Sequence, residues 1–384
     1  MNKFHFACPG EIFFGRGCVL EHADVFSRMG KRAYIVSSKF VDGVKNLALD
    51  DVKKALEGKG ILYAVDEEAQ PDPPVDSVVA IKDRALKFNP DFLVAVGGGS
   101  SMDTVKALNV LLKRPNDDPY DVLFGKGPHV YGVGGPDEGA LPFATVATTA
   151  GTGADIAGIA VLTRNDIQTK FGTNHRSFAD YVFVDSGYIS SCPKWLNHAA
   201  ALDALCHGIE TYLSRGSMDD VMTNMLTETS LRIFSKIKKP LLDGTMTEED
   251  YDLQALHSTL QGIVIVNELT GVPHGLGYPL SYYYHVPHGI ACAVFEGEYL
   301  RTVSDKARVG RVLELLGFES VDSFCAYIRE MVMQNVSIKV TPEQIDEWTD
   351  TFCATKWRVD RHPEELSRET VKSIYEKALS EFIG

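Results

Sequence analysis

The periodicity of apolar residues changes near the middle of the chain, and this change restricts the folds that the sequence can adopt. In the first half, short apolar runs typical of buried strands alternate with amphipathic stretches typical of helices. Such alternation forms βαβ units, whose right-handed crossovers build a doubly wound, mostly parallel sheet. From about Pro193 onward only helical patterns remain. The sequence therefore predicts an α/β, Rossmann-like N-terminal domain over residues 1–190 and an all-α C-terminal domain over residues 191–384.

The same patterns place the individual elements. Strands are expected at 33–36, 61–65, 91–96, 143–147, 156–162 and 181–184. One helix is expected after each of the first three strands, at 44–57, 75–88 and 102–112. Residues 114–141 are rich in Gly, Pro and Asp, and are expected to form a long surface loop. In the second half, helices are expected at 195–214, 217–238, 247–268, 289–302, 305–316, 320–334, 342–354 and 363–381.

Composition and charge argue against several classes of partner. A chain of 384 residues is long enough for two domains with sizeable cores. Its net charge of -14 argues against nucleic acid and anionic membrane surfaces as partners. The sequence contains neither an apolar run long enough to span a bilayer nor the apolar core of a signal peptide. Its seven cysteines form no Cys-x-x-Cys pair, which disfavours thiolate zinc sites and indicates free thiols in a reducing cytoplasm.

A glycine-rich turn follows the expected strand at 91–96. Its residues are Gly97, Gly98, Gly99 and Ser100. Glycines let the backbone approach a ligand closely, and the amides at the start of the next helix attract an anion such as a pyrophosphate. The alternative is a tight turn without a ligand, but three successive glycines cost backbone entropy, which favours the functional interpretation. The turn does not match the Gly-x-Gly-x-x-Gly fingerprint, so it is a weak signal by itself.

A second flexible segment follows the next expected strand. Thr148, Thr149 and Thr152 lie there together with two glycines. In α/β sheets, ligands bind at the carboxyl ends of strands, so these hydroxyl groups suit a nucleotide-facing loop. Lys170 comes shortly afterwards and could pair with a phosphate. The alternative is an exposed turn followed by an ordinary surface lysine.

Four side chains in two blocks predict a metal site. Asp203 and His207 are four residues apart in an Ala- and Leu-rich helical stretch, so they share one face of the helix. A carboxylate in such a stretch would be costly to bury without a cation. Two further histidines, His274 and His288, lie in a separate segment and can complete a four-ligand shell. Oxygen and nitrogen donors of this kind suit Fe(II), Zn(II), Ni(II) or Mn(II) better than calcium.

Taken together, these motifs resemble those of the iron-containing (group III) alcohol dehydrogenases, over nearly the full length of the chain. The motifs that carry the resemblance are Gly97 to Lys106, Thr148 to Gly153, Leu202 to His207 and His274 to Gly289. The resemblance implies a dehydroquinate synthase-like architecture, in which a Rossmann-like domain and a helical domain meet at the metal and the nicotinamide. It also implies a homodimer.

The resemblance also implies roles for individual residues. Asp203, His207, His274 and His288 are matched to the metal ligands, with Fe(II) as the first candidate and Zn(II) or another divalent ion as alternatives. For the cofactor, the resemblance implies a pyrophosphate cradle formed by Gly97, Gly98, Gly99 and Ser100. It implies a ribose or nicotinamide contact for Asp103 and a supporting role beneath that loop for Lys106. It also implies that the loop residues Thr148, Thr149 and Thr152, and the later Lys170, face the nucleotide.

The sequence departs from the family pattern at two informative positions. Many members have an aspartate that binds the adenosine 2′-hydroxyl where this chain has Ser38, followed by Lys39. A carboxylate there would repel a 2′-phosphate, so Ser38 and Lys39 predict that NADP(H) is favoured over NAD(H). Many members also carry a second histidine at the position of Tyr278. A tyrosine is a poor base at neutral pH, so a proton relay through that position is absent or altered.

The expected function is hydride transfer between NAD(P)(H) and a small primary alcohol or aldehyde, with the metal polarising the substrate oxygen. Tyr278 is included among the candidate catalytic residues. Alternatives are a glycerol-dehydrogenase-like or dehydroquinate-synthase-like enzyme of the same architecture, a metal-dependent hydrolase, and a metal- and nucleotide-binding protein without turnover. The glycine turn counts against the hydrolase, which needs no nucleotide.

Overall fold

The computed structural model describes residues 6–39, 45–125, 129–131, 140–216, 220–334 and 336–382. Contacts divide the chain into two compact units. The first is the α/β unit, Cys8–Cys192. The second is the helical unit, Pro193–Gly384, which also includes Ala7. The backbone N of Ala7 donates to Asn267 Oδ1 at 2.7 Å, and the backbone O of Ala7 accepts from Asn267 Nδ2 at 2.9 Å.

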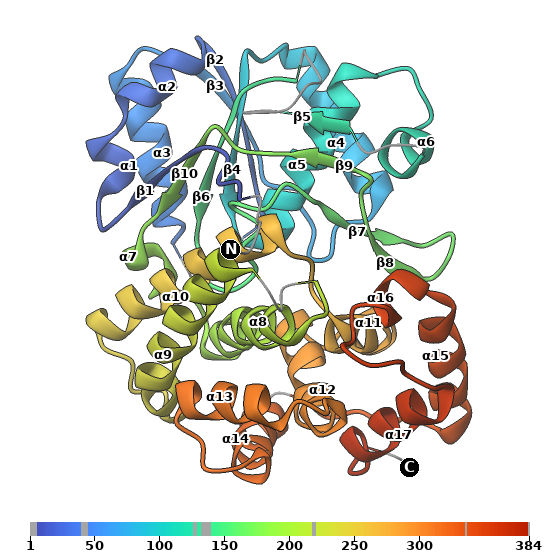
Figure 1. Ribbon diagram of the computed structural model, residues 1–384. Helices are drawn as coiled ribbons and strands as arrows, with labels where there is room; N and C mark the ends of the chain where they lie inside the picture. Colours follow the sequence, from blue (N-terminus) through green and yellow to red (C-terminus); the bar gives the residue numbers. More distant parts are fainter. Residues whose placement is uncertain are drawn as a thin grey trace. The chain divides into compact units, whose positions relative to one another are not determined.

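The α/β unit is built on a six-stranded parallel sheet in the order β1-β10-β6-β4-β2-β3 (Figure 1). Its strands are β1 (Glu11–Phe14), β2 (Arg32–Ser37), β3 (Leu62–Asp66), β4 (Phe92–Gly97), β6 (Phe143–Ala147) and β10 (Tyr181–Val184). Every residue of β4 and β6 is buried, as expected for central strands of a parallel sheet covered on both faces. Two small sheets pair β5 (His129–Tyr131) with β9 (His175–Ser177) and β7 (Val161–Arg164) with β8 (Thr169–Gly172).

Helices cover both sides of this sheet (Figure 1). They are α1 (Cys18–Glu21), α2 (Asp24–Met29), α3 (Leu47–Gly58), α4 (Val75–Phe88), α5 (Gly99–Lys113), α6 (Pro119–Phe124) and α7 (Ser186–Ile189). Apolar residues of α1 to α3, such as Phe26 and Leu56, pack against sheet residues that include Val94 and Phe183. Helix α5 packs on β4 and begins directly after it, so the turn between them lies at the carboxyl edge of the sheet.

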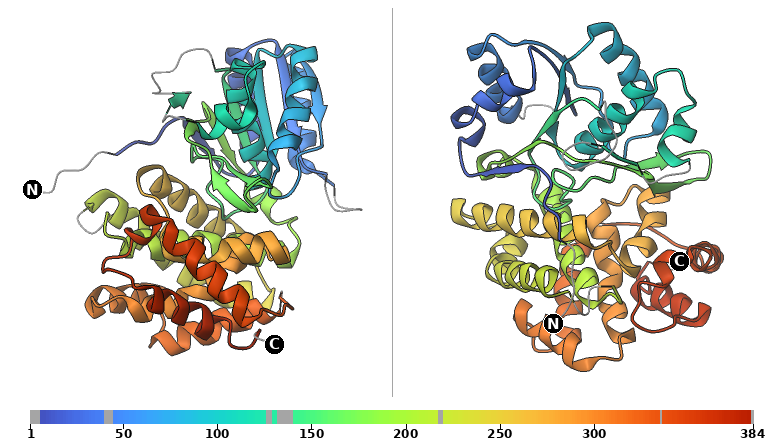
Figure 2. Two further views of the ribbon diagram at one scale, coloured as in Figure 1. Left: turned by 90° about the vertical axis from the view of Figure 1, so that its right-hand side faces the viewer. Right: turned by 45° about the horizontal axis from the view of Figure 1, so that its top comes forward.

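The second unit contains only helices in its described part (Figure 2). They are α8 (Lys194–Leu213), α9 (Val221–Asp243), α10 (Glu248–Asn267), α11 (Val272–Tyr284), α12 (His288–Thr302), α13 (Lys306–Leu316), α14 (Val321–Met333), α15 (Pro342–Ala354), α16 (Lys356–Val359) and α17 (Arg368–Ala378). Helix α8 is buried along almost its whole length, and α12 packs against α8, α11, α14 and α17. None of the described helices combines the length and apolar character that a bilayer span requires.

The parallel sheet and the helical unit confirm the predicted fold class, but several element predictions were wrong. The expected loop at 114–141 contains α6, which Asp118 caps by accepting from the backbone N of Tyr120 and Asp121 at 2.9 and 3.0 Å. It also contains β5. The strand expected at 156–162 begins only at Val161, because the preceding residues form a turn in which Ile156 and Ala157 donate to Gly153 O.

Several helices in the second half differ from the expectation: α9 ends at Asp243 rather than 238, and the short α16 was not expected. Helix α11 was not expected, because its prolines and glycines have low helix propensity; packing against α12 stabilises it instead. The last helix begins at Arg368 rather than 363, since the Ser367 hydroxyl accepts from Thr370 N at 3.1 Å and caps it there. The expected helix starts at 44 and 217 lie outside the described residues.

Candidate functional site

Helix α8 presents Asp203 and His207 on one buried face. Their spacing of four residues places Asp203 Oδ1 3.6 Å from His207 Nε2. The neighbouring residues of α8 are small and apolar, which lets this helix lie in the interior of the helical unit. A carboxylate in such surroundings is costly unless a cation or hydrogen-bond donors compensate its charge.

Helices α11 and α12 bring two further imidazoles to the same carboxylate. His274 lies in the first turn of α11, with Nε2 3.3 Å from Asp203 Oδ1. His288 is the first residue of α12, with Nε2 4.0 Å from the same oxygen. The structure thus brings all three predicted histidines to within 4.0 Å of Asp203 Oδ1, and the group whose ligand atoms all lie within 4.8 Å of one another consists of Asp203, His274, His288 and Cys292. We call Asp203, His207, His274 and His288 the metal cluster.

The chemistry of the metal cluster fits a divalent cation. Asp203 Oδ1 and His274 Nε2 are buried, and neither has a hydrogen-bond partner of good geometry among the described residues. Although burial raises the pKa of Asp203, the surrounding histidines lower it well below its usual value. Burial lowers the pKa of His274, but the charges of Glu210 and Asp203 raise it to about 10. The raised pKa of His274 means that this site attracts a proton to the imidazole. A divalent metal would take the place of that proton when it binds.

His288 is the most exposed member of the metal cluster. Its side chain is 27% exposed, whereas those of Asp203, His207 and His274 are 3–5% exposed. His288 therefore marks the solvent-facing side of the cluster. The ring of Tyr278 lies on this side, with its centroid 5.8 Å from that of His288.

Glu210 orients His274, a role that the sequence motifs did not predict. The Glu210 Oε1 atom contacts His274 Nδ1, and Oε2 accepts from the backbone N of Gly271 at 2.6 Å and of His274 at 3.3 Å. A carboxylate on the far ring nitrogen fixes the tautomer and rotation of a ligating histidine. The available signal was helical spacing, since Glu210 follows His207 by three residues and Asp203 by seven.

Two more buried groups adjoin these residues. Cys292 Sγ lies 3.7 and 3.8 Å from the two ring nitrogens of His288, and its helical spacing of four residues could have indicated this. Glu296 is fully buried beside Glu210, and neither of its carboxyl oxygens has a hydrogen-bond partner in the described part of the chain. Burial, followed by the charge of Glu210, raises the pKa of Glu296 well above its usual value.

Tyr278 makes a contact that the sequence did not reveal. It lies one turn after His274 on α11, and its Oη accepts a hydrogen bond of 2.8 Å from Nη2 of Arg358 on α16. The guanidinium carbon also lies 4.5 Å from the centroid of the Tyr278 ring. The tyrosine oxygen is thus the acceptor in this contact, which leaves its O–H group available as a hydrogen-bond donor.

In the α/β unit, the two predicted cofactor loops lie against each other. A Cβ built on Gly98 would lie 2.9 Å from Thr149 Oγ1, and one on Gly99 would lie 2.9 Å from Thr152 Cγ2. Thr148 N donates to Gly97 O at 2.9 Å, and the φ of +152° at Gly97 lies in the range that favours glycine. The backbone at the start of α5 is therefore bare of side chains, as a cradle for a phosphate group requires.

Ser38 also lies at this turn. Its Oγ is 3.0 Å from Ser101 Oγ, in the first turn of α5. Lys39 lies beside it but is exposed, and its Nζ pairs with Glu68 at 2.7 Å. The structure therefore brings Ser38 to the glycine turn and gives Lys39 an acidic partner.

Asp103, Lys106 and Lys170 support the loops through ion pairs. Asp103 accepts from Lys106 Nζ and from the backbone N of Val161, both at 3.0 Å. Lys170 Nζ binds Asp72 Oδ1 at 2.5 Å. The backbone N of Asp72 in turn donates to Ser100 Oγ at 3.2 Å, so Lys170 is linked to the glycine turn through this aspartate.

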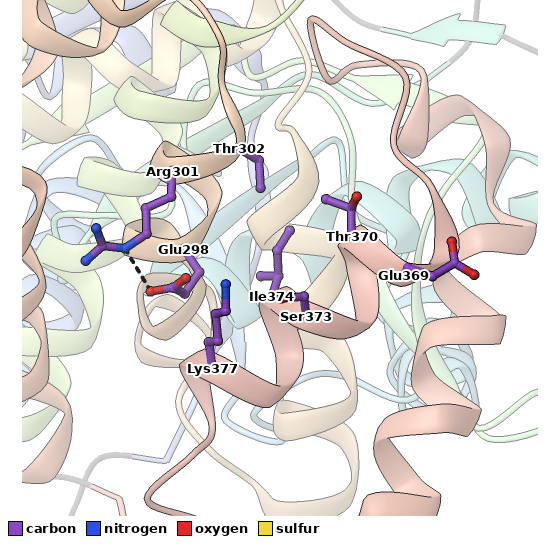
Figure 3. A pocket seen from close by; sticks show the side chains of 8 residues that line it. All are labelled: Glu298, Arg301, Thr302, Glu369, Thr370, Ser373, Ile374 and Lys377. Atoms are coloured by element: carbon purple, nitrogen blue, oxygen red, sulfur yellow. Dashed lines mark hydrogen bonds and ion pairs between the residues drawn. The ribbon is translucent and has the colours of Figure 1, made fainter.

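A separate surface pocket lies between α12 and α17 (Figure 3). Its lining mixes charges of both signs, and its Arg301 is already paired with Glu298 at 3.0 Å. None of the predicted site residues lines this pocket.

Known proteins match this chain along most of its length. The family profile described as iron-containing alcohol dehydrogenase matches residues 9–186, and that of the C-terminal part of the Fe-containing alcohol dehydrogenase family matches residues 198–379. Lactaldehyde reductase of Escherichia coli K12 is 27% identical over 295 residues, which cover 76% of this chain and 74% of that protein. Sulfoacetaldehyde reductase of Bilophila wadsworthia is 27% identical over 390 residues, or 95% and 96% of the two chains. An iron-containing alcohol dehydrogenase structure from Thermotoga maritima has a TM-score of 0.86 and 28% identity, covering 98% of this chain and 100% of that chain.

Proposed function

Because this chain belongs to the iron-containing alcohol dehydrogenase family, we propose that it transfers a hydride between NAD(P)(H) and a small primary alcohol or aldehyde in a metal-dependent reaction. The observation that carries this proposal is the metal cluster, in which three imidazoles surround one buried carboxylate oxygen at 3.3–4.0 Å. The nucleotide is assigned to the predicted domain 1–190 and the metal to the predicted domain 191–384.

The side chains of the helical unit have distinct roles in this proposal. When bound, a divalent metal supplies Lewis acidity toward the substrate oxygen, and the nicotinamide supplies or accepts the hydride. Asp203, His207, His274 and His288 hold the metal. Glu210 keeps His274 Nε2 turned toward Asp203. Tyr278 accepts a hydrogen bond from Arg358, so it can donate its proton to the oxygen of a reduced aldehyde but does not act as a base.

Fe(II) is our first assignment for the metal. A shell of one carboxylate and three imidazoles accepts several divalent ions, and availability in the cell decides among them. The nearby Cys292 thiol is a soft donor that favours Zn(II) as the alternative.

For the cofactor, we propose that NADP(H) is preferred. Ser38 lies at the glycine turn and offers a hydroxyl donor where a carboxylate would repel a 2′-phosphate. Lys39 adds positive charge nearby, although Glu68 offsets part of it. We also expect the homodimer that the family resemblance implies.

The central experiment tests metal-dependent turnover. The purified protein is treated with a chelator, reloaded with Fe(II), Zn(II) or no metal, and assayed for NADPH oxidation with short-chain aldehydes. We expect activity only after reloading, and none from an Asp203→Asn variant. Nucleotide and metal binding without turnover of any aldehyde, alcohol or polyol would contradict the proposal, and turnover of glycerol alone would favour the polyol alternative.

The cofactor assignment has its own variant. Ser38→Asp is expected to raise the KM for NADPH at least tenfold and to leave the KM for NADH nearly unchanged, because only NADPH carries the repelled 2′-phosphate. Ser191→Asp, at a hydroxyl away from the glycine turn, is the matched control. An unchanged ratio of NADPH to NADH efficiency in Ser38→Asp would overturn the assignment.

A further inference from the structure

Arg358 is a buried cation with no carboxylate partner among the described residues. The residue is only 8% exposed, and its guanidinium carbon lies 4.5 Å from the ring centroids of both Tyr278 and Trp357. Its Nη2 donates to Tyr278 Oη, whereas the buried Nη1 has no hydrogen-bond partner within the part of the chain that the structure describes. Burying a charge is costly unless it is paired, so this arrangement calls for an anion.

A neighbouring arginine shows the usual solution. Arg361, three residues later, pairs with Glu268 at 2.6 Å and donates to Ser214 Oγ at 3.1 Å. Among the described residues, Arg361 is thus paired with a carboxylate although its Nε lacks a hydrogen-bond partner, whereas Arg358 has no ion pair with a carboxylate. Arg358 Nη1 is therefore a buried donor that lacks a partner in the described part of the chain and that an anion entering beside it would satisfy.

Tyr278 links Arg358 to the most exposed member of the metal cluster. The Tyr278 ring that lies against the guanidinium is also 5.8 Å from the His288 ring, and His288 is the most exposed member of the cluster. Gly275, the residue after His274, is needed for this close packing, because a Cβ there would lie 2.9 Å from Arg358 Cδ. The Tyr278 side chain thus lies between Arg358 and His288 and contacts both of them.

We propose that Arg358 binds the carboxylate of an aldehyde substrate, so that the preferred substrate is a short ω-oxo acid rather than a neutral aldehyde. This proposal rests on the proposed function. The aldehyde end faces the metal cluster, and the carboxylate at the other end accepts from Nη1. Guanidinium–carboxylate hydrogen bonds are charge-assisted, and they are strong when both groups are shielded from water.

The kinetic test compares acids with neutral aldehydes of equal chain length. The metal-loaded enzyme is assayed with 4-oxobutanoate against butanal, and with 5-oxopentanoate against pentanal. We expect the wild type to favour one of the acids by about 10- to 100-fold in kcat/KM, as the loss of a hydrogen bond to a charged group predicts. Equal or better efficiency with the neutral aldehydes in the wild type would overturn the proposal.

Variants assign the preference to Arg358. Arg358→Met is expected to lower the ratio of kcat/KM for the favoured acid to that for its neutral counterpart at least tenfold, because the loss of the contact with Tyr278 affects both substrates alike, whereas the loss of the anion contact affects only the acid. Arg358→Lys keeps the positive charge but loses the paired N–H donors of the guanidinium group, so it is expected to keep more of the preference for the acid than Arg358→Met does. Arg361→Gln is the matched control and should keep the preference of the wild type. A parallel loss for acid and neutral aldehyde in both Arg358 variants would show a structural role only.

A binding measurement separates this proposal from the proposed function. Butyrate carries a carboxylate but no aldehyde group, so it can occupy the anion site without being reduced. We expect butyrate to raise the thermal midpoint of the wild-type holoenzyme, and to raise the midpoints of Arg358→Met and Arg358→Lys by less. If no aldehyde is turned over but butyrate binds in an Arg358-dependent manner, the anion site stands and the dehydrogenase proposal fails. If aldehydes are turned over and butyrate stabilises all variants equally, the anion site fails. Should Arg358→Met not fold, Arg358→Lys and the wild-type preference decide.

Discussion

Glu210 sets the orientation of His274, because its carboxylate contacts the Nδ1 side of the ring and leaves Nε2 facing Asp203. The same carboxylate accepts from two backbone amides at the start of α11, so it also anchors that helix. One side chain therefore links α8 to α11 and prepares a ligand atom. Its role does not depend on direct contact with a metal.

Glu210→Gln is expected to weaken metal binding about 10- to 100-fold, because the amide retains the shape but not the charge that makes the imidazole a strong ligand. Competition with a chelator of known affinity measures this directly. Glu228→Gln, on α9 and paired with Arg311, is the control and should bind metal as the wild type does. Equal affinity of both variants would contradict the role of Glu210.

Asp155 is a second residue whose charge matters, because it is buried beside the cofactor loop. Burial raises the pKa of this carboxyl group from its usual 3.8 to about 6. A carboxyl group with a raised folded-state pKa contributes stability that is fully present below about pH 4 and is lost as the pH rises through 6. Asp155→Asn should therefore unfold at higher urea concentration than the wild type at pH 8, with a gain of about 1–3 kcal/mol.

The comparison of pH values provides the control for Asp155. At pH 4 the carboxyl group of the wild type is protonated, so the two proteins should have nearly equal free energies of unfolding. Asp166→Asn, at an exposed position, should not reproduce the gain at pH 8. A difference between wild type and Asp155→Asn that does not grow with pH would contradict the assignment.

At the scale of elements, the metal cluster exists because three helices approach one another closely. Gly289 allows α12 to lie against α8, since a Cβ there would lie 1.9 Å from Ala199 O and 2.7 Å from Asp203 N. Gly277 serves the contact between α11 and α12 in the same way, with 2.7 Å to Ala291 O. These glycines are required by packing, and they reduce the helix propensity of the segments that carry the ligands.

Gly289→Ala is expected to lower the free energy of unfolding by about 1–3 kcal/mol and to weaken metal binding, because α12 must move away from α8 and carry His288 with it. Denaturation in urea and metal content after purification measure the two effects. Gly310→Ala in α13 is the matched control: nothing lies within 4 Å of its added Cβ, so the helix should gain about 0.5–1 kcal/mol. Normal metal content in Gly289→Ala would refute this explanation.

At the scale of the whole molecule, the predicted cofactor site and the predicted metal site belong to different compact units. The glycine turn with its two loops belongs to residues 8–192, and the metal cluster belongs to the helical unit from residue 193 onward. The family profiles divide at nearly the same place, with matches to 9–186 and 198–379, and they confirm the resemblance drawn from the motifs. Each ligand should therefore stabilise its own unit first.

Removing the metal is expected to lower the thermal midpoint of the full chain by several degrees, because a ligand at 100 times its Kd contributes about 2.7 kcal/mol to stability. Calorimetry before and after chelation measures the shift, and reloading should reverse it. Asp203→Asn should show no response to the chelator. A midpoint that is the same with and without metal in the wild type would mean that the metal cluster binds no ion under these conditions.

Local sequence patterns were sufficient to predict much of this protein. The alternation of strands and helices, the glycine turn after β4 and the spacing of Asp203 and His207 all depend on neighbours within one or two turns of the chain, where periodicity carries the information. The four residues of the metal cluster and the cofactor loops were named from these patterns together with the family resemblance. Their roles in binding stay predictions.

The sequence by itself determined the fold class, because apolar periodicity is local, and it determined the identities of the candidate site residues. Only the tertiary structure decided that residues 272–284 form a helix, that Glu210 binds a ring 64 positions away, and that Arg358 lies against Tyr278 at 80 positions' distance with one donor unused. Contacts between residues so far apart in the sequence depend on how whole helices pack. They produce no periodic pattern in the sequence from which they could be predicted. The substrate preference proposed here comes from one of these contacts.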